Sequence, residues 1–166
     1  MLIVSLLIWL ESGGPVIFKQ LRMGKNEKTF VIYKFRTMRM DAPPEKAARE
    51  FENADQYITK VGAFLRRTSI DELPQLLNIL KGDMSIVGYR PVCVTETELN
   101  ALRKQYGVFS VRPGLTGYAQ VLGRDNIDYR EKAALDAEYV AKRSIKLDLW
   151  CIFKTVAVVF TGEGTK

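Results

Sequence analysis

Two adjacent carboxylates in the stretch RRTSIDELPQLLNIL are the residues whose type and spacing most clearly suggest chemistry. Asp71 and Glu72 stand where a helix is expected to begin, and Arg66 and Arg67 come just before them. The unpaired N–H groups and partial positive charge of a helix N-terminus favour an ionised carboxylate, and nearby arginines act in the same direction. We therefore expect Asp71 to be ionised and fixed. Such a carboxylate can serve as a nucleophile or as a metal ligand.

The leucines behind the pair predict a helix that is anchored on the rest of the domain. They recur at helical spacing, at Leu73, Leu76, Leu77 and Leu80. Two starts of this helix are open. Ser69 and Glu72 have capping-box spacing, which would begin the helix at Ser69. A start at Asp71 instead places Pro74 in the first turn, where its missing N–H has no cost. Acidic residues are common in first turns, so the pair alone does not establish catalysis.

Further charged residues lie on glycine-containing segments after this helix. They are Lys81, Asp83 and Arg90 in KGDMSIVGYRP, and Arg112 and Arg124 in RPGLTGYAQVLGRDN. Glycine lets backbone approach a phosphate, and arginine forms paired hydrogen bonds with phosphate oxygens. The chain has no histidine, which excludes Ser-His-Asp and Cys-His catalysis and imidazole-bound zinc. Together these features indicate phosphate chemistry with a divalent cation.

The composition is that of one folded domain. The chain has 166 residues, of which 47% are hydrophobic, and a net charge of +6. A basic balance favours nucleic acid, anionic lipid or phosphorylated small molecules as partners, without choosing among them. The two cysteines, Cys93 and Cys151, have no metal-binding spacing, so we expect reduced thiols in a cytosol-facing protein.

We expect an α+β fold that is rich in helix. Residues 16–22 and 29–38 form two β-rich runs joined by the polar loop 23–28, which predicts a strongly basic β-hairpin. Residues 111–126 indicate loop and short strand. Helical segments are predicted at 40–57, 58–67, 95–107 (with a Thr95–Glu98 capping box), 128–143 and 144–160.

Both ends of the chain are apolar. The N-terminal MLIVSLLIWL would be a helix about 15 Å long, half of a bilayer's hydrocarbon thickness, so it is either a core helix or a membrane-dipping segment. Lys146, Asp148 and Lys154 argue against a spanning helix at 144–160, which is either an in-plane amphipathic helix or a core helix. The membrane contacts that we predict are Leu2, Ile3, Leu6, Leu7, Trp9, Trp150 and Phe153.

Three long motifs carry a resemblance to a known family. They are GPVIFKQLRMGKNEKTFVIYKFRTM, ITKVGAFLRRTSIDELPQLLNILKGDMSIVG with the following Arg-Pro, and RPGLTGYAQVLGRDN with the later LDAEYV and LDL, in this order across residues 13 to 149. Together they resemble the bacterial sugar transferases, which are monotopic polyprenol phosphate phosphoglycosyl transferases. Three ordered motifs that cover nearly the whole chain are far more specific than any single pattern.

The resemblance implies a reaction. A sugar 1-phosphate would pass from a UDP-sugar to undecaprenyl phosphate, giving undecaprenyl-diphospho-sugar and UMP at the start of a bacterial surface glycan. It implies a ping-pong route with a covalent phosphosugar on Asp71, with Glu72 as its magnesium-linked or acid-base catalytic partner, and a requirement for Mg²⁺ held by both carboxylates. It also implies phosphate or nucleotide-sugar contacts at Arg66, Arg90, Arg124 and Asn126.

The resemblance also implies a location. Residues 1–15 would be the C-terminal part of a re-entrant membrane helix, and 16–166 a cytosol-facing catalytic domain. The protein would be monotopic on the cytoplasmic face of the bacterial inner (plasma) membrane. Its partners would be the UDP-sugar, undecaprenyl phosphate and membrane lipid, not nucleic acid, while a homodimer is left open. The sugar and the glycan pathway are not fixed by the sequence.

The chain departs from the family pattern at three places. Tyr89 precedes Arg90-Pro91 where the family has Pro-Arg-Pro, and Gly123-Arg124-Asp125 replaces Gly-Arg-Asn, with Asn126 one place later. The first part of the re-entrant helix and its Ser-Pro break are also missing from the sequence, which otherwise resembles the small, minimal form of the family.

Two other classes of function fit parts of the sequence. A nucleic-acid-binding module could stack bases on the basic hairpin, whose aromatic residues are Phe18, Phe30, Tyr33 and Phe35. It explains neither the Asp71–Glu72 pair nor the apolar ends. A peripheral membrane scaffold could use those ends without chemistry. High salt should release the nucleic-acid binder from membranes but not a monotopic enzyme, whereas only turnover distinguishes the scaffold.

Overall fold

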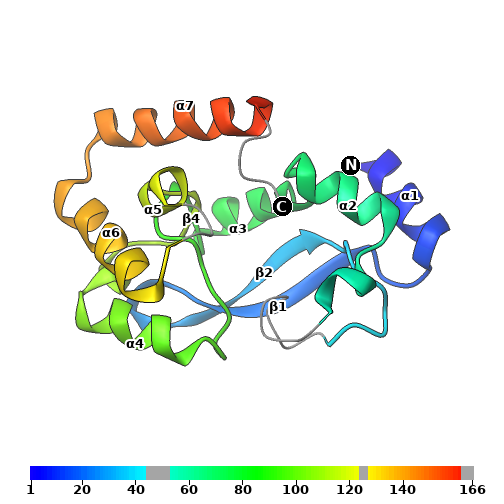
Figure 1. Ribbon diagram of the computed structural model, residues 1–166, viewed down its shortest axis with the longest axis horizontal. Helices are drawn as coiled ribbons and strands as arrows, with labels where there is room; N and C mark the ends of the chain where they lie inside the picture. The colour runs from blue at the N-terminus through cyan, green and yellow to red at the C-terminus, as the bar shows by residue number, and fades with distance from the viewer. Residues whose placement is uncertain (44–52, 124–126, 162–166) are drawn as a thin grey trace.

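The computed structural model describes residues 1–43, 53–123 and 127–161, and it confirms the α+β class (Figure 1). The α-helices are α1 Leu2–Ser12, α2 Lys60–Arg67, α3 Gln75–Lys81, α4 Thr97–Gln105, α5 Tyr118–Leu122, α6 Tyr129–Lys142 and α7 Ile145–Thr161. The strands are β1 Ile17–Met23, β2 Thr29–Phe35, β3 Ser85–Val87 and β4 Gly114–Thr116. Short 3₁₀ turns are η1 Lys25–Glu27, η3 Ala54–Tyr57, η4 Ile70–Glu72 and η5 Val108–Ser110.

The predicted hairpin is confirmed and forms the long axis of the molecule (Figure 1). Strands β1 and β2 pair antiparallel from Ile17 opposite Phe35 to Met23 opposite Thr29. Helix α3 is tied to this hairpin by a buried polar side chain, because Asn78 accepts from the Tyr33 N–H (3.0 Å) and donates to the Val31 carbonyl (2.7 Å).

A second sheet consists of the short parallel strands β3 and β4, with Ser85 opposite Gly114 and Val87 opposite Thr116. A Cβ atom at Gly114 would collide with the Gly88 backbone, so glycine permits this close approach. Helix α7 covers β3 through Cys151, which packs against Val87 in the core. Because the two strands are parallel, the segment that follows β3 lies beside the one that follows β4, and a Cβ atom at Gly117 would meet the Gly88 carbonyl.

Helix α1 is packed onto the body by its C-terminal half. Ile8 is buried against Phe35 and Leu65. The Glu11 carboxylate accepts from the N–H groups of Lys60 (2.8 Å) and Val61 (3.0 Å) at the start of α2, where helix N–H groups lack partners. Within the described parts of the chain, no helix is both long enough and apolar enough to cross a membrane. The predicted boundary between residues 15 and 16 stays a prediction.

The structure corrects the prediction for the helix behind the carboxylates. Helix α3 begins after Pro74, its N-cap, and Asp71 and Glu72 lie in the separate turn η4, so neither open start is right. The leucines do not anchor the helix. They are exposed by 42% at Leu73, 48% at Leu76, 51% at Leu77 and 83% at Leu80. The anchor of α3 is Asn78, and the leucines are left for another partner.

Several local predictions also differ. Helix α4 is present, but its N-cap is Glu96 instead of the expected Thr95. Helix α5 forms where only loop and strand were predicted, although strand β4 is confirmed. The predicted helix at 40–57 lies largely outside the described residues, and its last part is the 3₁₀ turn η3.

Candidate active site

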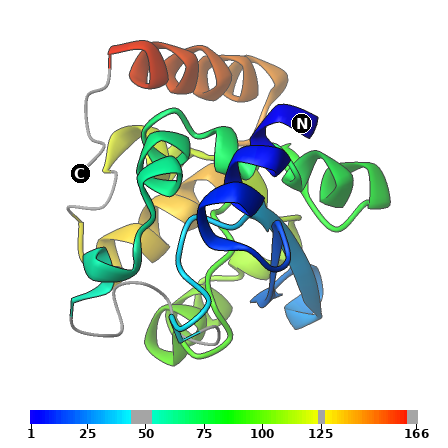
Figure 2. The same ribbon diagram turned by 90° about the vertical axis from the view of Figure 1, so that its right-hand side faces the viewer.

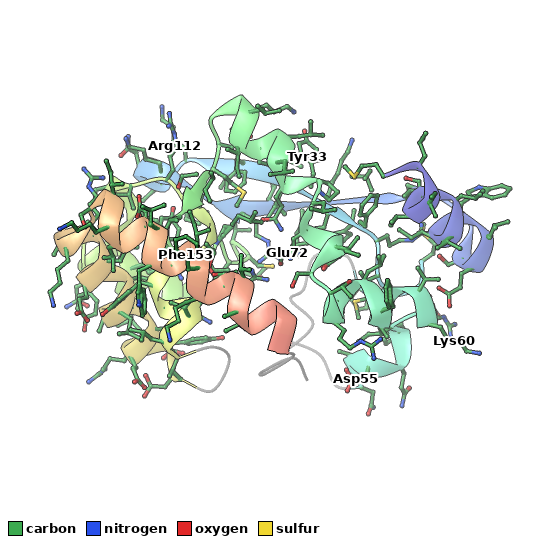
Figure 3. All side chains as sticks on the ribbon, turned by 90° about the horizontal axis from the view of Figure 1, so that it is seen from above. Tyr33, Asp55, Lys60, Glu72, Arg112 and Phe153 are labelled. Carbon is green, nitrogen blue, oxygen red and sulfur yellow. The ribbon has the colours of Figure 1, made fainter. Side chains whose placement is uncertain are left out.

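The Asp71–Glu72 pair lies in a turn that three elements hold in place. Turn η4 connects α2 to α3 and contacts β2. Ser69, before the turn, has a left-handed backbone (φ 56°), which is uncommon for a residue other than glycine. Seen from above in Figure 3, Glu72 lies near the centre of the molecule. Asp71 is only 8% exposed in this turn.

Two cations from distant segments converge on Glu72. The Lys34 Nζ on β2 is 2.7 Å from Glu72 Oε1. Arg90, in the segment after β3, donates through Nη2 to Oε1 (2.6 Å) and through Nη1 to Oε2 (3.4 Å). Both oxygens of Glu72 are therefore engaged, and its charge is matched by two positive groups that also lie near Asp71.

The Asp71 carboxylate lacks such partners. Within the described residues, no hydrogen bond or ion pair holds it. The charges of Lys34, Arg90 and Arg66 act on it, and Arg66 itself is oriented by donation from Nε to Thr37 Oγ1 (2.9 Å). The site thus contains one carboxylate that is fixed by cations and one that is free to react or to bind a ligand.

Burial and charge move the two carboxyl pKa values in opposite directions. Burial raises the pKa of Asp71 above its ordinary value, and Lys34 opposes that rise only in part. Burial also favours neutral Glu72, but the charges of Arg90 and Lys34 outweigh it and hold its pKa well below the usual range. Arg66 favours ionised Asp71, as expected from the sequence, and so does Arg90, but burial of the turn outweighs them and the net shift of the pKa is upward.

Among the predicted site residues, the structure brings Arg66 and Arg90 to the carboxylates. Arg124 and Asn126, like the departure at Asp125, lie outside the described residues. Arg67 instead lies over the exposed Phe64 ring, 5.9 Å from its centroid. The sequence reasoning missed Lys34 as a site residue. It is one of seven cations between 19 and 39, and no signal in a single sequence marks the one that is buried beside Glu72.

The residues present fit a magnesium ion, although they do not form a complete cage. In the described part of the chain, no three acidic or thiol side chains come together. Mg²⁺ is commonly held by one or two protein carboxylates together with substrate phosphates and water. Asp71 has the free carboxylate that such a site needs, whereas Glu72 is already matched by Lys34 and Arg90. Asp71 is therefore the better candidate ligand of the pair.

The low pKa of Glu72 predicts a pH-dependent contribution to stability. A carboxyl whose pKa is depressed on folding contributes stability above its unfolded pKa, here the ordinary 4.5, and loses it as the pH falls toward the folded value. Glu72→Gln should lower the free energy of unfolding by about 3 kcal/mol at pH 7, because two cations lose their partner. The difference from wild type should shrink between about pH 5 and pH 3. Thermal melts without divalent cations measure it, and a difference independent of pH would contradict the assignment.

Comparison with known proteins places this arrangement among sugar transferases. The family model described as bacterial sugar transferase matches residues 1–162. The chain is 45% identical over 168 residues to the galactosyl transferase CpsE of Streptococcus agalactiae, covering 94% of this chain and 37% of that protein. It is 40% identical to the exopolysaccharide production protein ExoY of Rhizobium meliloti over 179 residues, with coverage of 99% and 78%.

A third relative has a name that states a reaction. The chain is 40% identical over 171 residues to the UDP-N-acetylgalactosamine-undecaprenyl-phosphate N-acetylgalactosaminephosphotransferase of Aeromonas hydrophila. The match covers 100% of this chain and 40% of that protein. The chain thus spans well under half the length of two of these three relatives.

Proposed function

The chain belongs to the bacterial sugar transferase family, and we propose that it moves a sugar 1-phosphate from a UDP-sugar to undecaprenyl phosphate, starting a bacterial surface glycan. The name of the Aeromonas relative supports both substrates. The observation that carries the proposal is the Asp71 carboxylate, which is buried, unengaged and surrounded by the charges of Lys34, Arg90 and Arg66. That is the setting an anionic nucleophile needs in order to approach a diphosphate.

The proposed reaction has two displacements at one phosphorus atom. First, an Asp71 oxygen attacks the phosphorus that carries the sugar, the bond to the bridging oxygen breaks, and UMP leaves with the electron pair. Next, a phosphate oxygen of undecaprenyl phosphate attacks the same phosphorus, and the Asp71 carboxylate is released. Both nucleophiles are anions and UMP is a good leaving group, so no strong general acid is required. This is consistent with a chain that lacks histidine.

The protein's cations solve the main difficulty of this chemistry, which is repulsion between an anionic nucleophile and an anionic substrate. Arg90 is half-exposed, with 36% of its side chain accessible, so it can contact a phosphate while it stays paired to Glu72. Lys34 supplies a fixed positive charge beneath both carboxylates. A bound Mg²⁺, held by Asp71 and substrate phosphates, would supply further charge neutralisation. Glu72 then acts by orienting Lys34 and Arg90, not as a base.

The exposed apolar residues support a place for this reaction at a membrane surface. Helices α1, α2, α3 and α7 lie along one side of the molecule, and α4 lies on the other (Figures 1 and 2). Most exposed large apolar side chains of the described residues belong to these four helices: Leu2, Ile3, Leu6, Leu7, Trp9, Leu10, Phe64, Leu76, Leu77, Leu80, Ile145, Leu149, Trp150, Phe153 and Val156. Such a concentration is typical of a membrane or protein contact. We therefore infer monotopic contact with the cytoplasmic leaflet.

The α3 leucines offer a test of this surface. We expect the double variant Leu77→Gln/Leu80→Gln to lower the partition coefficient onto liposomes roughly tenfold or more, because two exposed apolar groups are lost. The free energy of unfolding should change by about 0.5 kcal/mol or less, since neither side chain is buried. Flotation with vesicles measures the partition coefficient.

The control is Tyr106→Gln, which changes an exposed ring at the end of α4, on the other side of the molecule. It should leave partitioning unchanged. Equal losses in the two variants, or none in the leucine variant, would exclude α3 from the membrane contact.

The nucleic-acid alternative gains no support from the hairpin. Phe35 is buried in the core beside Ile8, and the Tyr33 hydroxyl accepts from Lys81 at 2.8 Å. Phe18 and Phe30 are half-buried. These four rings therefore do not form an exposed platform on which bases could stack.

Release of UMP is the experiment that tests the proposed function. The protein in nanodiscs receives Mg²⁺, undecaprenyl phosphate and a panel of UDP-sugars. Release of more than one UMP per protein from one sugar, dependent on the lipid phosphate, would support the reaction and identify the donor. A membrane scaffold would bind vesicles and release no UMP with any sugar, and that outcome in a longer chain bearing the family's full membrane helix would reject the proposal.

A further inference from the structure

The segment from Tyr89 to Cys93, which carries Arg90, is held by its backbone. Each of its five carbonyl groups accepts a hydrogen bond from another element: Tyr89 from Gly114 N–H (2.9 Å), Arg90 from Arg103 Nη1 (2.9 Å), Pro91 from Arg22 Nη1 (3.3 Å), Val92 from Met23 N–H (3.3 Å) and Cys93 from Asn100 Nδ2 (3.0 Å). These donors come from β1, α4 and β4. Buried carbonyls are nearly always hydrogen-bonded, and here the donors tie the segment to three separate elements, which is the rigid support that a precise site requires.

Arg103 on α4 makes the contact directly at Arg90, and its own orientation is fixed. The side chain is fully buried, and it forms an ion pair with Asp136 on α6 through Nε (2.8 Å) and Nη2 (2.6 Å). Its third donor, Nη1, points to the Arg90 carbonyl. The planar guanidinium thus makes both contacts at once, which a lysine ammonium at the end of a flexible chain does not reproduce.

Tyr89 restrains the same guanidinium from another side. The Arg103 Cζ lies 5.0 Å from the centroid of the Tyr89 ring, which in turn packs edge-on against Phe109 at 5.5 Å. Tyrosine does not restrict its own backbone as proline would. In this chain, the Tyr89 ring stacks on the guanidinium of the Arg103–Asp136 pair. This contact restrains the backbone next to Arg90, which tyrosine by itself does not.

We propose that Arg103, oriented by Asp136, is a positioning residue that holds Arg90 against Glu72. The Arg90 side chain is 36% accessible, so burial does not fix it, and its reach to Glu72 depends on where its backbone is anchored. A buried ion pair is seldom the most stable solution for a protein core. The presence of this pair between α4 and α6 has a functional reason if Arg103 holds the backbone carbonyl of Arg90 in place. This inference rests on the proposed function.

A double-mutant cycle tests the proposal with the full chain in nanodiscs. Arg103→Lys keeps a positive charge beside Asp136, and we expect kcat for UMP release to fall roughly 10- to 100-fold with KM for the donor changed less, because misplacement near a site mainly weakens the transition state. In the Arg90→Ala background, the same substitution should lower kcat less than about twofold, because its target is gone. Equal losses in both backgrounds, or no loss in either, would overturn the proposal.

A second variant separates positioning from stability. Arg103→Met/Asp136→Leu removes both charges at similar volume, an exchange that often leaves stability unchanged or higher. We expect the variant to fold, as thermal melting verifies, with a kcat at least as low as that of Arg103→Lys. Full activity in this variant would reject a positioning role. Tyr139→Phe is the control, since it deletes other polar contacts of α6, to Asp148 (2.8 Å) and to the Val87 carbonyl (3.4 Å), without contacting residues 89–93.

Amide hydrogen exchange provides a readout that does not need turnover. In Arg103→Lys, peptides covering residues 88–93 should exchange faster, while those covering β1 and β2 keep wild-type rates. If the wild-type chain releases no UMP, the proposed function is rejected, but the anchoring role of Arg103 is not. Unchanged amide exchange at residues 88–93 in Arg103→Lys is the result that would reject that anchoring role.

Discussion

Asp71→Asn is expected to abolish UMP release while the protein stays folded. An amide is not a nucleophile toward phosphorus, so loss of the carboxylate oxygen removes the proposed covalent step, and kcat should fall at least about a thousandfold. Stability should be preserved or slightly improved. Burial already disfavours the Asp71 charge, and no hydrogen bond or ion pair within the described residues depends on it. Thermal melting and UMP release measured on one preparation separate the two effects.

Asp41→Asn is the matched control. It makes the same chemical change at an exposed position, where the carboxylate pairs with the exposed Arg39 at 2.7 Å. It should keep wild-type kcat. A second observation bears on the mechanism: wild type given donor without lipid should release about one UMP per protein and gain the mass of a phosphosugar, and Asp71→Asn should do neither. Turnover retained by Asp71→Asn would refute the nucleophile assignment.

The parts of the fold that follow from local patterns were predictable. The two β-rich runs of 16–38 and the polar loop between them predict the hairpin that the structure shows. The adjacent acidic residues, behind arginines and ahead of leucines, mark the candidate site. In contrast, the start of α3 depends on the left-handed turn at Ser69, a backbone conformation that serine rarely adopts and that composition does not indicate.

The α3 leucines show the limit of periodicity as a signal. Apolar residues at helical spacing indicate a helix with one apolar face, but not what covers that face. Here the leucines are exposed within the described residues, and Asn78, a polar residue in the same stretch, makes the contact with the hairpin. A helix with an exposed apolar face and a core helix therefore have the same sequence pattern.

The site's electrostatics depended on contacts that no local pattern contains. Lys34 and Arg90 reach Glu72 from segments 38 and 18 residues away. Arg103 and Asp136, separated by 33 residues, meet only because α4 packs on α6. In an isolated helix, the N-terminus lowers the pKa of a nearby carboxyl. In this protein, burial of turn η4 reverses the direction, and the pKa of Asp71 is raised.

Lys34→Met is the second substitution that should have a large effect. Lys34 is bonded to Glu72 and its charge lowers the pKa of both carboxyls. Its removal leaves the two acidic side chains facing each other with less compensation, so kcat should fall roughly a hundredfold, as when one charge-stabilising donor is deleted from an active site. The fold should persist, because burial already disfavours the lysine charge and lowers its pKa, and methionine fills a similar volume.

The pH profile distinguishes this electrostatic role from simple loss of a contact. Without Lys34, the pKa of Asp71 rises further above its ordinary value, so a larger fraction is protonated at any given acidic pH. If ionised Asp71 is the nucleophile, the acid limb of kcat/KM for UMP release must move to higher pH in Lys34→Met. Lys19→Met, an exposed lysine on β1 of the same hairpin, should leave both the rate and the limb unchanged. A lower rate with an unchanged acid limb of kcat/KM would mean that Lys34 contacts the substrate and does not shift the pKa of Asp71. Only coupling between the Lys34 charge and the Asp71 carboxyl can move that limb.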